Sequence, residues 1–204
     1  MRVGPDLRAP LERRAGAAGL SLSAPLADGL LAYLGLLARW NARINLTAFD
    51  LSAPSDEAID RLIIEPVRAS RLVRPGDHRA IDIGSGGGSP AVPFALAAPA
   101  IEMTMVEVRA KKAAFLREVA RTVREGLRVE SRRAEDLAAS GAAGRFDLVT
   151  MRAVRADRSL WAAVDALLAP DGRILWFGGI GQITEVAGFA ISEEADRVLV
   201  LTRA

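Results

Sequence analysis

Apolar residues in the first third of the chain recur at the spacing of amphipathic helices. Between positions 26 and 44 they return every three or four residues, after a serine and a proline that favour a helix start. A second helical stretch runs from about position 55 to 73. It begins with Ser-Asp-Glu and is closed by Arg-Pro-Gly. We expect these two helices to form an N-terminal helical extension over residues 1–76.

The pattern changes after position 76 to short β-type runs that alternate with helical stretches. Strands are expected at 80–84, 101–108, 127–131, 146–151, 173–177 and 197–202, with helices at 90–98, 110–125, 135–139 and 157–168. Alternation of β and α predicts a mainly parallel sheet that is covered on both faces. Residues 77–204 are therefore expected to form an α/β domain.

A glycine-rich loop follows the first predicted strand. Residues 82–90 read Asp-Ile-Gly-Ser-Gly-Gly-Gly-Ser-Pro, a D-x-G-x-G-x-G arrangement at a strand-to-helix turn. Glycine suits such a turn because the backbone bends sharply and a ligand comes closer than any Cβ would permit. The loop favours a nucleotide-like cofactor, and the alternative is an ordinary flexible turn.

Three residues narrow the choice of cofactor. Glu107 ends the next predicted strand, where its carboxylate can accept hydrogen bonds from both ribose hydroxyls; a solvated strand end is the alternative. Ser89 stands where a dinucleotide fingerprint has its third glycine. Asp82 suits a cationic amino acid moiety better than a pyrophosphate. S-adenosylmethionine is therefore favoured over NAD, and the absence of Gly-Lys-Ser/Thr after the glycines excludes a P-loop.

Composition excludes several classes of chemistry. The chain has no cysteine, which rules out disulfides, thiolate metal sites and methyltransferases that attack pyrimidine C5 through a thiolate. Lys and Arg number 27 against 25 acidic residues, so a net charge of +2 is weak evidence for nucleic acid. A basic row could line one side of a groove, or be a solvated helix face. The row consists of Lys111, Lys112, Arg117, Arg121, Arg124 and Arg128.

The chain carries no mark of a membrane protein or a metalloprotein. No apolar run approaches the roughly 20 residues of a membrane span, and the first residues lack a signal-peptide core. We expect a cytoplasmic monomer without a metal. The sole histidine, His78, lies in a turn-rich segment and is expected to be exposed. Trp40 is expected to anchor the N-terminal helix on the sheet. The role of Asn45 is left open, with a turn cap as one alternative.

With the glycine loop in place, the chain resembles the RsmG (GidB) family of rRNA methyltransferases. The segment 40–47 reads Trp-Asn-Ala-Arg-Ile-Asn-Leu-Thr and matches the family's W-N-x-x-x-N-L-T signature. The glycine loop, Lys111-Lys112 and Phe146-Asp147 with Arg152-Ala153 follow in the family's order, over about residues 26–175. The resemblance implies a Rossmann-like class I S-adenosylmethionine-dependent fold. It also implies methylation of guanosine N7 in 16S rRNA of the small ribosomal subunit.

The resemblance also implies roles for particular residues. Arg152 would lie beside cofactor and substrate, although a surface salt bridge is an equal alternative on physical grounds. Glu135 would lie near the adenine, or simply belong to an acidic first helical turn. The cofactor-binding residues implied are Asp82, Gly84, Gly86, Gly88, Ser89, Glu107, Ala134 and Glu135. The candidates for RNA contact are Lys111, Lys112, Arg152 and Arg155.

Some positions depart from the family pattern. Leu62 stands where the family has a histidine, Glu65-Pro66 where it has Asp-Ser, and Phe177 where it has a lysine. These changes leave two other functions open: a same-fold methyltransferase that acts on another RNA or a small molecule, and a catalytically silent paralogue that only binds the cofactor. Guanine N7 has a lone pair and no proton to remove, so its methylation needs positioning rather than a general base.

Overall fold

The computed structural model describes residues 7–178, 188–195 and 197–204, which form a seven-stranded sheet in the order β3-β2-β1-β4-β5-β7-β6. Its strands are β1 (Arg79–Ile83), β2 (Glu102–Val106), β3 (Arg128–Glu130), β4 (Phe146–Arg152), β5 (Leu168–Phe177), β6 (Phe189–Ala195) and β7 (Val198–Arg203). Strands β1 to β5 are parallel to one another, whereas β7 runs antiparallel to β5 and β6 antiparallel to β7. The expected α/β class with a mainly parallel sheet is confirmed.

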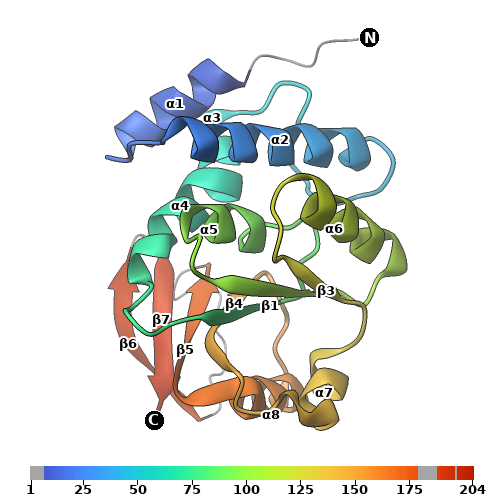
Figure 1. Cartoon of the computed structure of the whole chain (residues 1–204), viewed down its shortest axis with the longest axis vertical. Helices are drawn as coiled ribbons and strands as arrows, with labels where there is room; N and C mark the ends of the chain where they lie inside the picture. The colour runs from blue at the N-terminus through green and yellow to red at the C-terminus, as the bar shows by residue number, and fades with distance from the viewer. Residues whose placement is uncertain (1–6, 179–187, 196) are drawn as a thin grey trace.

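Helices cover both faces of this sheet (Figure 1). The helical segments are α1 (Arg8–Ala17), α2 (Ala24–Asn41), α3 (Asp56–Ile59), η1 (Asp60–Ile64), α4 (Glu65–Ala69), η2 (Ser70–Leu72), α5 (Ala91–Ala97), α6 (Ala110–Thr122), α7 (Ala134–Leu137), η3 (Ala138–Ala142) and α8 (Arg158–Leu167). Helices α5 and α6 lie on one face, α7 and α8 lie on the other, and α1 to α4 form a further layer outside α5. None of the described helices combines the length and the apolar character that a membrane crossing needs.

The hydrophobic core has one part on each face of the sheet. On the first face, Leu37 of α2 belongs to the same buried cluster as Phe94 of α5 and Phe115 of α6, and all three are fully buried. On the other face, Trp161 of α8 belongs to a second cluster with Ile81 of β1. Burial of each such large side chain stabilises the fold by roughly 1.5–3 kcal/mol. The N-terminal helices therefore share a core with the face of the sheet that α5 and α6 cover.

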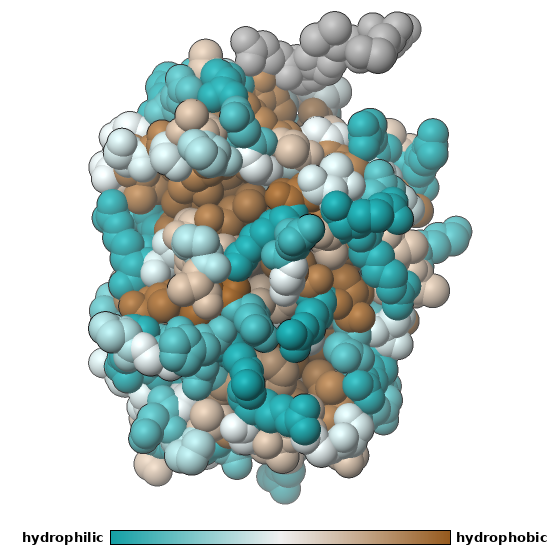
Figure 2. All heavy atoms as spheres, in the orientation of Figure 1, coloured by the Kyte–Doolittle hydropathy of each residue, from teal (hydrophilic) through white to brown (hydrophobic). Residues whose placement is uncertain are grey.

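Hydrophilic and hydrophobic side chains are unevenly distributed over the surface. Figure 2 shows hydrophilic side chains crossing the middle of one face, whereas hydrophobic ones reach the surface mainly between the helices of its upper half.

Two elements were not expected from the sequence. Helix α1 buries only Leu11 and Ala15, so its apolar periodicity is weak, and ion pairs from Arg13 and Arg14 to Asp56 and from Arg14 to Asp60 tie it to the helices below. Strand β6 is exposed along most of its length. An edge strand leaves one row of backbone groups unpaired, and charged side chains such as Glu193 and Glu194 discourage its pairing with another chain.

The ends of the N-terminal helices differ from the predicted ones. The first was expected to reach position 44 but ends at Asn41, because Asn41 Oδ1 accepts hydrogen bonds from the backbone N–H groups of Leu46 and Thr47. Asn41 therefore caps this turn. The second was expected as one α-helix, but a π-helical turn at 60–64 lies within it.

Candidate functional site

The glycine loop leaves β1 at its carboxyl end and is held against β2. The backbone N–H groups of Gly84 and Ser85 both donate to the carbonyl oxygen of Val106 at 3.0 Å. Gly84 has φ +73°, and a Cβ at this position would lie 2.9 Å from Cγ2 of Val154. A side chain here would strain the backbone and collide with a neighbour, so glycine is required for the turn.

Glu107 braces the loop from the neighbouring strand. Its Oε2 accepts a hydrogen bond from the Gly86 N–H at 3.0 Å, and its Oε1 accepts one from the Arg109 N–H at 2.8 Å. The side chain belongs to the buried polar residues, so the alternative of a solvated strand end is wrong. Each carboxylate oxygen has a further lone pair, which leaves Glu107 able to accept hydrogen bonds from a ligand as well.

Two hollows open beside the loop, and Gly84 lines both. The larger, of about 390 Å³, lies between the loop and the N-terminal helices; we call it the extension-side hollow. It is lined by Leu37, Leu46, Thr47, Phe49, Arg61, Leu62, Gly84, Ser85, Gly86, Gly87, Ser89, Lys112, Arg152 and Ala153. The smaller, of about 250 Å³, is lined by Ile83, Gly84, Val106, Glu107, Val108, Arg132, Arg133, Ala134, Glu135, Val154, Arg155, Asp157 and Leu160; we call it the strand-end hollow.

Most of the site residues expected from the sequence meet at these two hollows. Among the cofactor-binding candidates, only Asp82 and Gly88 line neither of them. Lys112 and Arg155 each line one hollow. Lys111 instead lines a separate hollow together with Arg39 and Trp40. The structure therefore divides the predicted RNA-contact residues among three places.

Asp82 lies beneath the loop. Its side chain is buried, and Oδ1 accepts a hydrogen bond from the Thr150 hydroxyl at 2.6 Å. The buried Oδ2 has no hydrogen-bond donor among the described residues. Burial raises the pKa of this carboxyl to about 6, against the opposing effect of its hydrogen bonds. A buried carboxylate oxygen without a donor costs free energy unless a ligand or water satisfies it.

Arg152 is the centre of a buried polar network. Its Nη1 donates to the carbonyl oxygen of Arg61 at 2.5 Å and to Ser89 Oγ at 2.9 Å, and its Nη2 donates to Glu65 Oε2 at 2.8 Å. The guanidinium also lies 4.9 Å from the ring centroid of Phe177. A salt bridge was one of the two expectations for Arg152, but the pair is buried rather than at the surface, with side chains 13% and 8% exposed.

The electrostatics of this network follow from its burial. Desolvation lowers the pKa of Arg152 to about 10, and Glu65 opposes the shift, so the guanidinium stays protonated at neutral pH. Desolvation likewise raises the pKa of Glu65, against the attraction of Arg152 and Arg61. Arg152 forms a wall of the extension-side hollow and ties three segments together.

Two residues, Tyr33 and Trp40, make contacts that the sequence did not predict. The buried Tyr33 hydroxyl donates to the carbonyl oxygen of Gly87 at 2.6 Å, across more than fifty residues of chain. No local pattern signals this contact. Trp40 does anchor the N-terminal helix, but on α6 rather than the sheet: its Nε1 donates to Glu118, and its ring packs against Phe115.

The basic row does not form one helix face. Arg124 lies beyond the end of α6, and its guanidinium donates to the carbonyl oxygens of three residues around the end of α5: Ala95, Pro99 and Ile101. Arg128 belongs to β3 and pairs with Glu102. These two arginines are engaged within the protein. In the described ranges, no group of three or more acidic or histidine side chains could hold a metal ion.

Comparison of the fold with solved structures supports the α/β class at low sequence identity. A Staphylococcus aureus protein assigned as a caffeoyl-CoA O-methyltransferase matches with a TM-score of 0.58 at 13% identity, over 95% of this chain and 97% of that one. A Plasmodium falciparum protein assigned as a protein-L-isoaspartate O-methyltransferase, in complex with S-adenosyl-L-homocysteine, matches with a TM-score of 0.54 at 18% identity, over 97% and 93% of the two chains. These likenesses establish the fold.

Sequence comparisons identify the family. The chain is 35% identical over 170 residues to the ribosomal RNA small subunit methyltransferase G of Syntrophotalea carbinolica, which covers 83% of this chain and 76% of that protein. It is 35% identical over 217 residues to the protein of the same name from Xanthomonas axonopodis pv. citri, over 98% and 97% of the two chains. The family model GidB, described as rRNA small subunit methyltransferase G, matches residues 27–202. The chain therefore belongs to the GidB family.

Proposed function

We propose that this protein transfers the methyl group of S-adenosylmethionine to N7 of a guanosine in 16S rRNA of the small ribosomal subunit. The observation that carries the proposal is the loop at Gly84, which separates two hollows in a chain of the GidB family. One hollow suits a nucleoside and the other an acceptor base. In a methyl transfer, the donor sulfonium and the acceptor base lie on opposite sides of the methyl group. The loop at Gly84, which borders both hollows, would hold the two ligands in this arrangement.

The residues around the loop fit the cofactor. Glu107 has acceptor capacity left for ribose hydroxyls, and Ala134 and Glu135 line the same strand-end hollow. The buried Asp82 Oδ2, which has no donor among the described residues, suits the ammonium of the methionine moiety. Gly84, Gly86, Gly88 and Ser89 form the turn around which that moiety would lie. S-adenosylmethionine supplies a sulfonium-bound methyl group that a nucleophile can take directly.

The chain's own residues would position the base rather than move a proton. Guanine N7 carries a lone pair and no proton, so no general base is assigned. Phe49 offers an aromatic face in the extension-side hollow, and the side chains of Arg61 and Lys112 offer positive charge there. Arg152, held by Glu65 and Ser89, would fix the wall against which the base lies. We therefore assign Arg152 a positioning role, with Lys111, Lys112 and Arg155 as the candidates for contact with the RNA.

We also propose a division of the chain into two parts. Residues 1–76 would form the helical extension that closes the acceptor side, and residues 77–204 the cofactor-binding domain. We further propose that the protein acts as a monomer in the cytoplasm, where ribosomal subunits mature, and without a metal.

The experiment is methyl transfer to small ribosomal subunits that lack the modification, read by primer extension and mass spectrometry of the rRNA. Incorporation at a single guanosine N7 is the expected result. Methylation of a different RNA or of a small molecule would favour the alternative that the substitution of Leu62 for a histidine left open. Calorimetric binding of S-adenosylhomocysteine without any product would favour a silent paralogue.

A further inference from the structure

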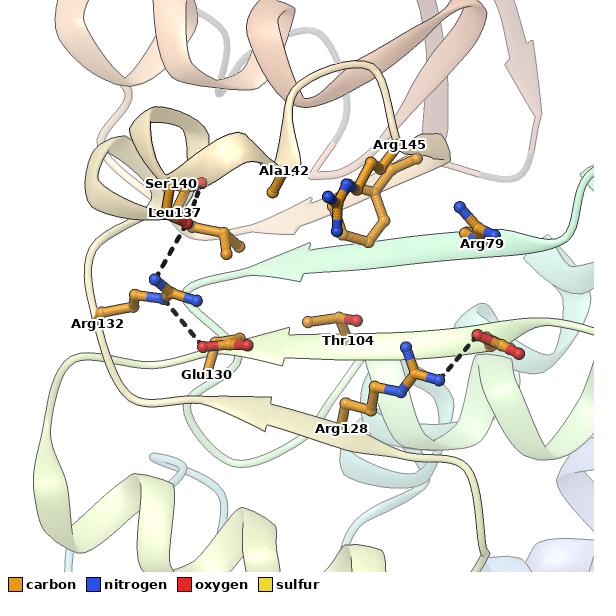
Figure 3. A pocket seen from close by; sticks show the side chains of 11 residues that line it. Arg79, Thr104, Arg128, Glu130, Arg132, Leu137, Ser140, Ala142 and Arg145 are labelled. Carbon is orange, nitrogen blue, oxygen red and sulfur yellow. Dashed lines mark hydrogen bonds and ion pairs between the residues drawn. The ribbon is translucent and has the colours of Figure 1, made fainter.

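Another hollow lies over β1, β2 and β3 and begins at the strand ends that are far from the glycine loop. Arg79, Glu102 and Arg128 begin β1, β2 and β3 and line it, whereas the loop and Glu107 follow the last residues of β1 and β2. The hollow has a volume of about 460 Å³. Helix α7 and η3 border the hollow, and Figure 3 shows their residues Leu137, Ser140 and Ala142 above the strands. We call this region the strand-start hollow.

The strand-start hollow carries a surplus of positive charge. Four arginines and two glutamates line it. Arg128 pairs with Glu102 at 3.2 Å, and the ion pair between Arg132 and Glu130 measures 2.9 Å. No carboxylate of the described residues pairs with the guanidinium groups of Arg79 and Arg145, which also line the hollow and are exposed. The lining therefore offers a net charge of +2 to a ligand.

The arrangement of these groups suits an oxyanion. Figure 3 shows Arg79, Arg128 and Arg145 disposed around Thr104 of β2, whose side chain lies on the floor between them. A guanidinium presents N–H groups in a planar fork that matches the oxygens of a phosphate, and arginines on several segments can hold one phosphate from different sides. The lining is mostly charged and has few apolar groups, which disfavours a hydrophobic ligand.

We propose that the strand-start hollow binds phosphodiester groups of the RNA substrate, away from the nucleotide that is methylated. This proposal rests on the proposed function, which supplies an RNA substrate. Arg132 lines both this hollow and the strand-end hollow, so the two lie next to each other. Phosphate contacts fix the register of a protein on nucleic acid without reading its sequence. The hollow would thus orient the RNA while the target base occupies the other side of the glycine loop.

The test compares two variants that change the charge of the hollow in opposite directions. The double variant Arg79→Gln/Arg145→Gln removes the two guanidinium groups that lack carboxylate partners, and Glu102→Gln frees Arg128 from its ion pair. Binding to unmethylated small-subunit rRNA is measured at several salt concentrations. The slope of log affinity against log salt should fall in magnitude by about 1.4–1.8 in the double variant, because each phosphate contact contributes about 0.7–0.9. Glu102→Gln should bind RNA more tightly than the unmodified protein.

Binding of S-adenosylhomocysteine and the thermal midpoint serve as controls, and neither should change in the double variant. An unchanged salt slope would overturn the proposal. A loss of binding to whole subunits but not to naked rRNA would also overturn it, in favour of a contact with a ribosomal protein. Because RNA binding is measured without methyl transfer, a protein that fails to methylate guanosine would contradict the proposed function and leave this test readable.

Discussion

The Nη2 atom of Arg152 donates a hydrogen bond to Oε2 of Glu65 at 2.8 Å, and this contact joins the end of β4 to the first residue of α4. Both side chains are buried, and Arg61 also donates to the Glu65 carboxylate at 3.1 Å. The N-terminal extension and the sheet thus meet through charges as well as through the shared hydrophobic core. Because Arg152 lines the extension-side hollow, loss of the pair should weaken binding of the acceptor more than binding of the cofactor.

Removal of the Glu65 carboxylate tests whether its ion pair with Arg152 stabilises the contact between the N-terminal extension and the sheet. Glu65→Ala leaves Arg152 buried without its anionic partner, and breaking such a pair costs about 3 kcal/mol of unfolding free energy. Denaturant unfolding measures the loss. The matched control is Glu12→Gln, which removes a largely exposed partner of Arg8 and should change stability by less than about 0.5 kcal/mol. Equal effects of the two changes would contradict the idea that the buried pair joins the layers.

Cofactor affinity is expected to depend on pH through the ionisation of the Asp82 carboxyl group. Its pKa is raised to about 6, so the group is mainly neutral at pH 5 and mainly charged at pH 7. If the charged form binds the ammonium of S-adenosylhomocysteine, affinity should rise about tenfold between these pH values. Calorimetry across this range gives the profile.

Asp82→Asn provides the control for that profile, because the amide keeps the shape and the Thr150 contact but does not titrate in this range. Its affinity should be low and flat with pH. A profile that rises in the same way in the variant would assign the effect to another group. The stability of the unliganded protein should depend on pH in the opposite direction. Between about pH 4 and 6 the native state binds this proton more tightly than the unfolded state does, so the contribution of Asp82 to stability falls as pH rises.

Alanine substitutions at two glycines distinguish the effect of backbone strain from the effect of reduced backbone flexibility. Gly84→Ala places a Cβ at 2.9 Å from Val154 on a residue with φ +73°, so it should destabilise the fold by about 1–3 kcal/mol and weaken S-adenosylhomocysteine binding. Gly35→Ala places a Cβ in open space within α2 and should stabilise by about 0.5–1 kcal/mol. Thermal unfolding and calorimetry distinguish them. Matching behaviour of the two variants would rule out a special role for the Gly84 conformation.

Contacts between residues that are close in the chain could be predicted from the sequence, whereas contacts between distant segments could not. The loop at Gly84 and its partner Glu107 could be predicted because one βαβ unit carries both, and the ends of its two parallel strands fix where they meet. The bonds from Tyr33 to Gly87 and from Arg152 to Glu65 join segments that are far apart in the chain, and no local pattern specifies such pairs. The role of Glu65 becomes visible only in the structure, where its carboxylate pairs with Arg152 and Arg61.

Phe49 is expected to contribute to recognition of the acceptor base. It lies in the loop after α2 and lines the extension-side hollow with Gly86. Stacking of an unpaired base on an aromatic ring contributes about 1–3 kcal/mol, so Phe49→Ala should lower kcat/KM for the RNA by about 10- to 100-fold. Phe49→Tyr keeps the ring and should retain most of the activity. The affinity for S-adenosylhomocysteine should stay within about twofold in both variants, because stacking concerns the base and not the cofactor. An equal loss in cofactor affinity would instead assign Phe49 to the packing of the loop, because the two ligands then depend on it alike.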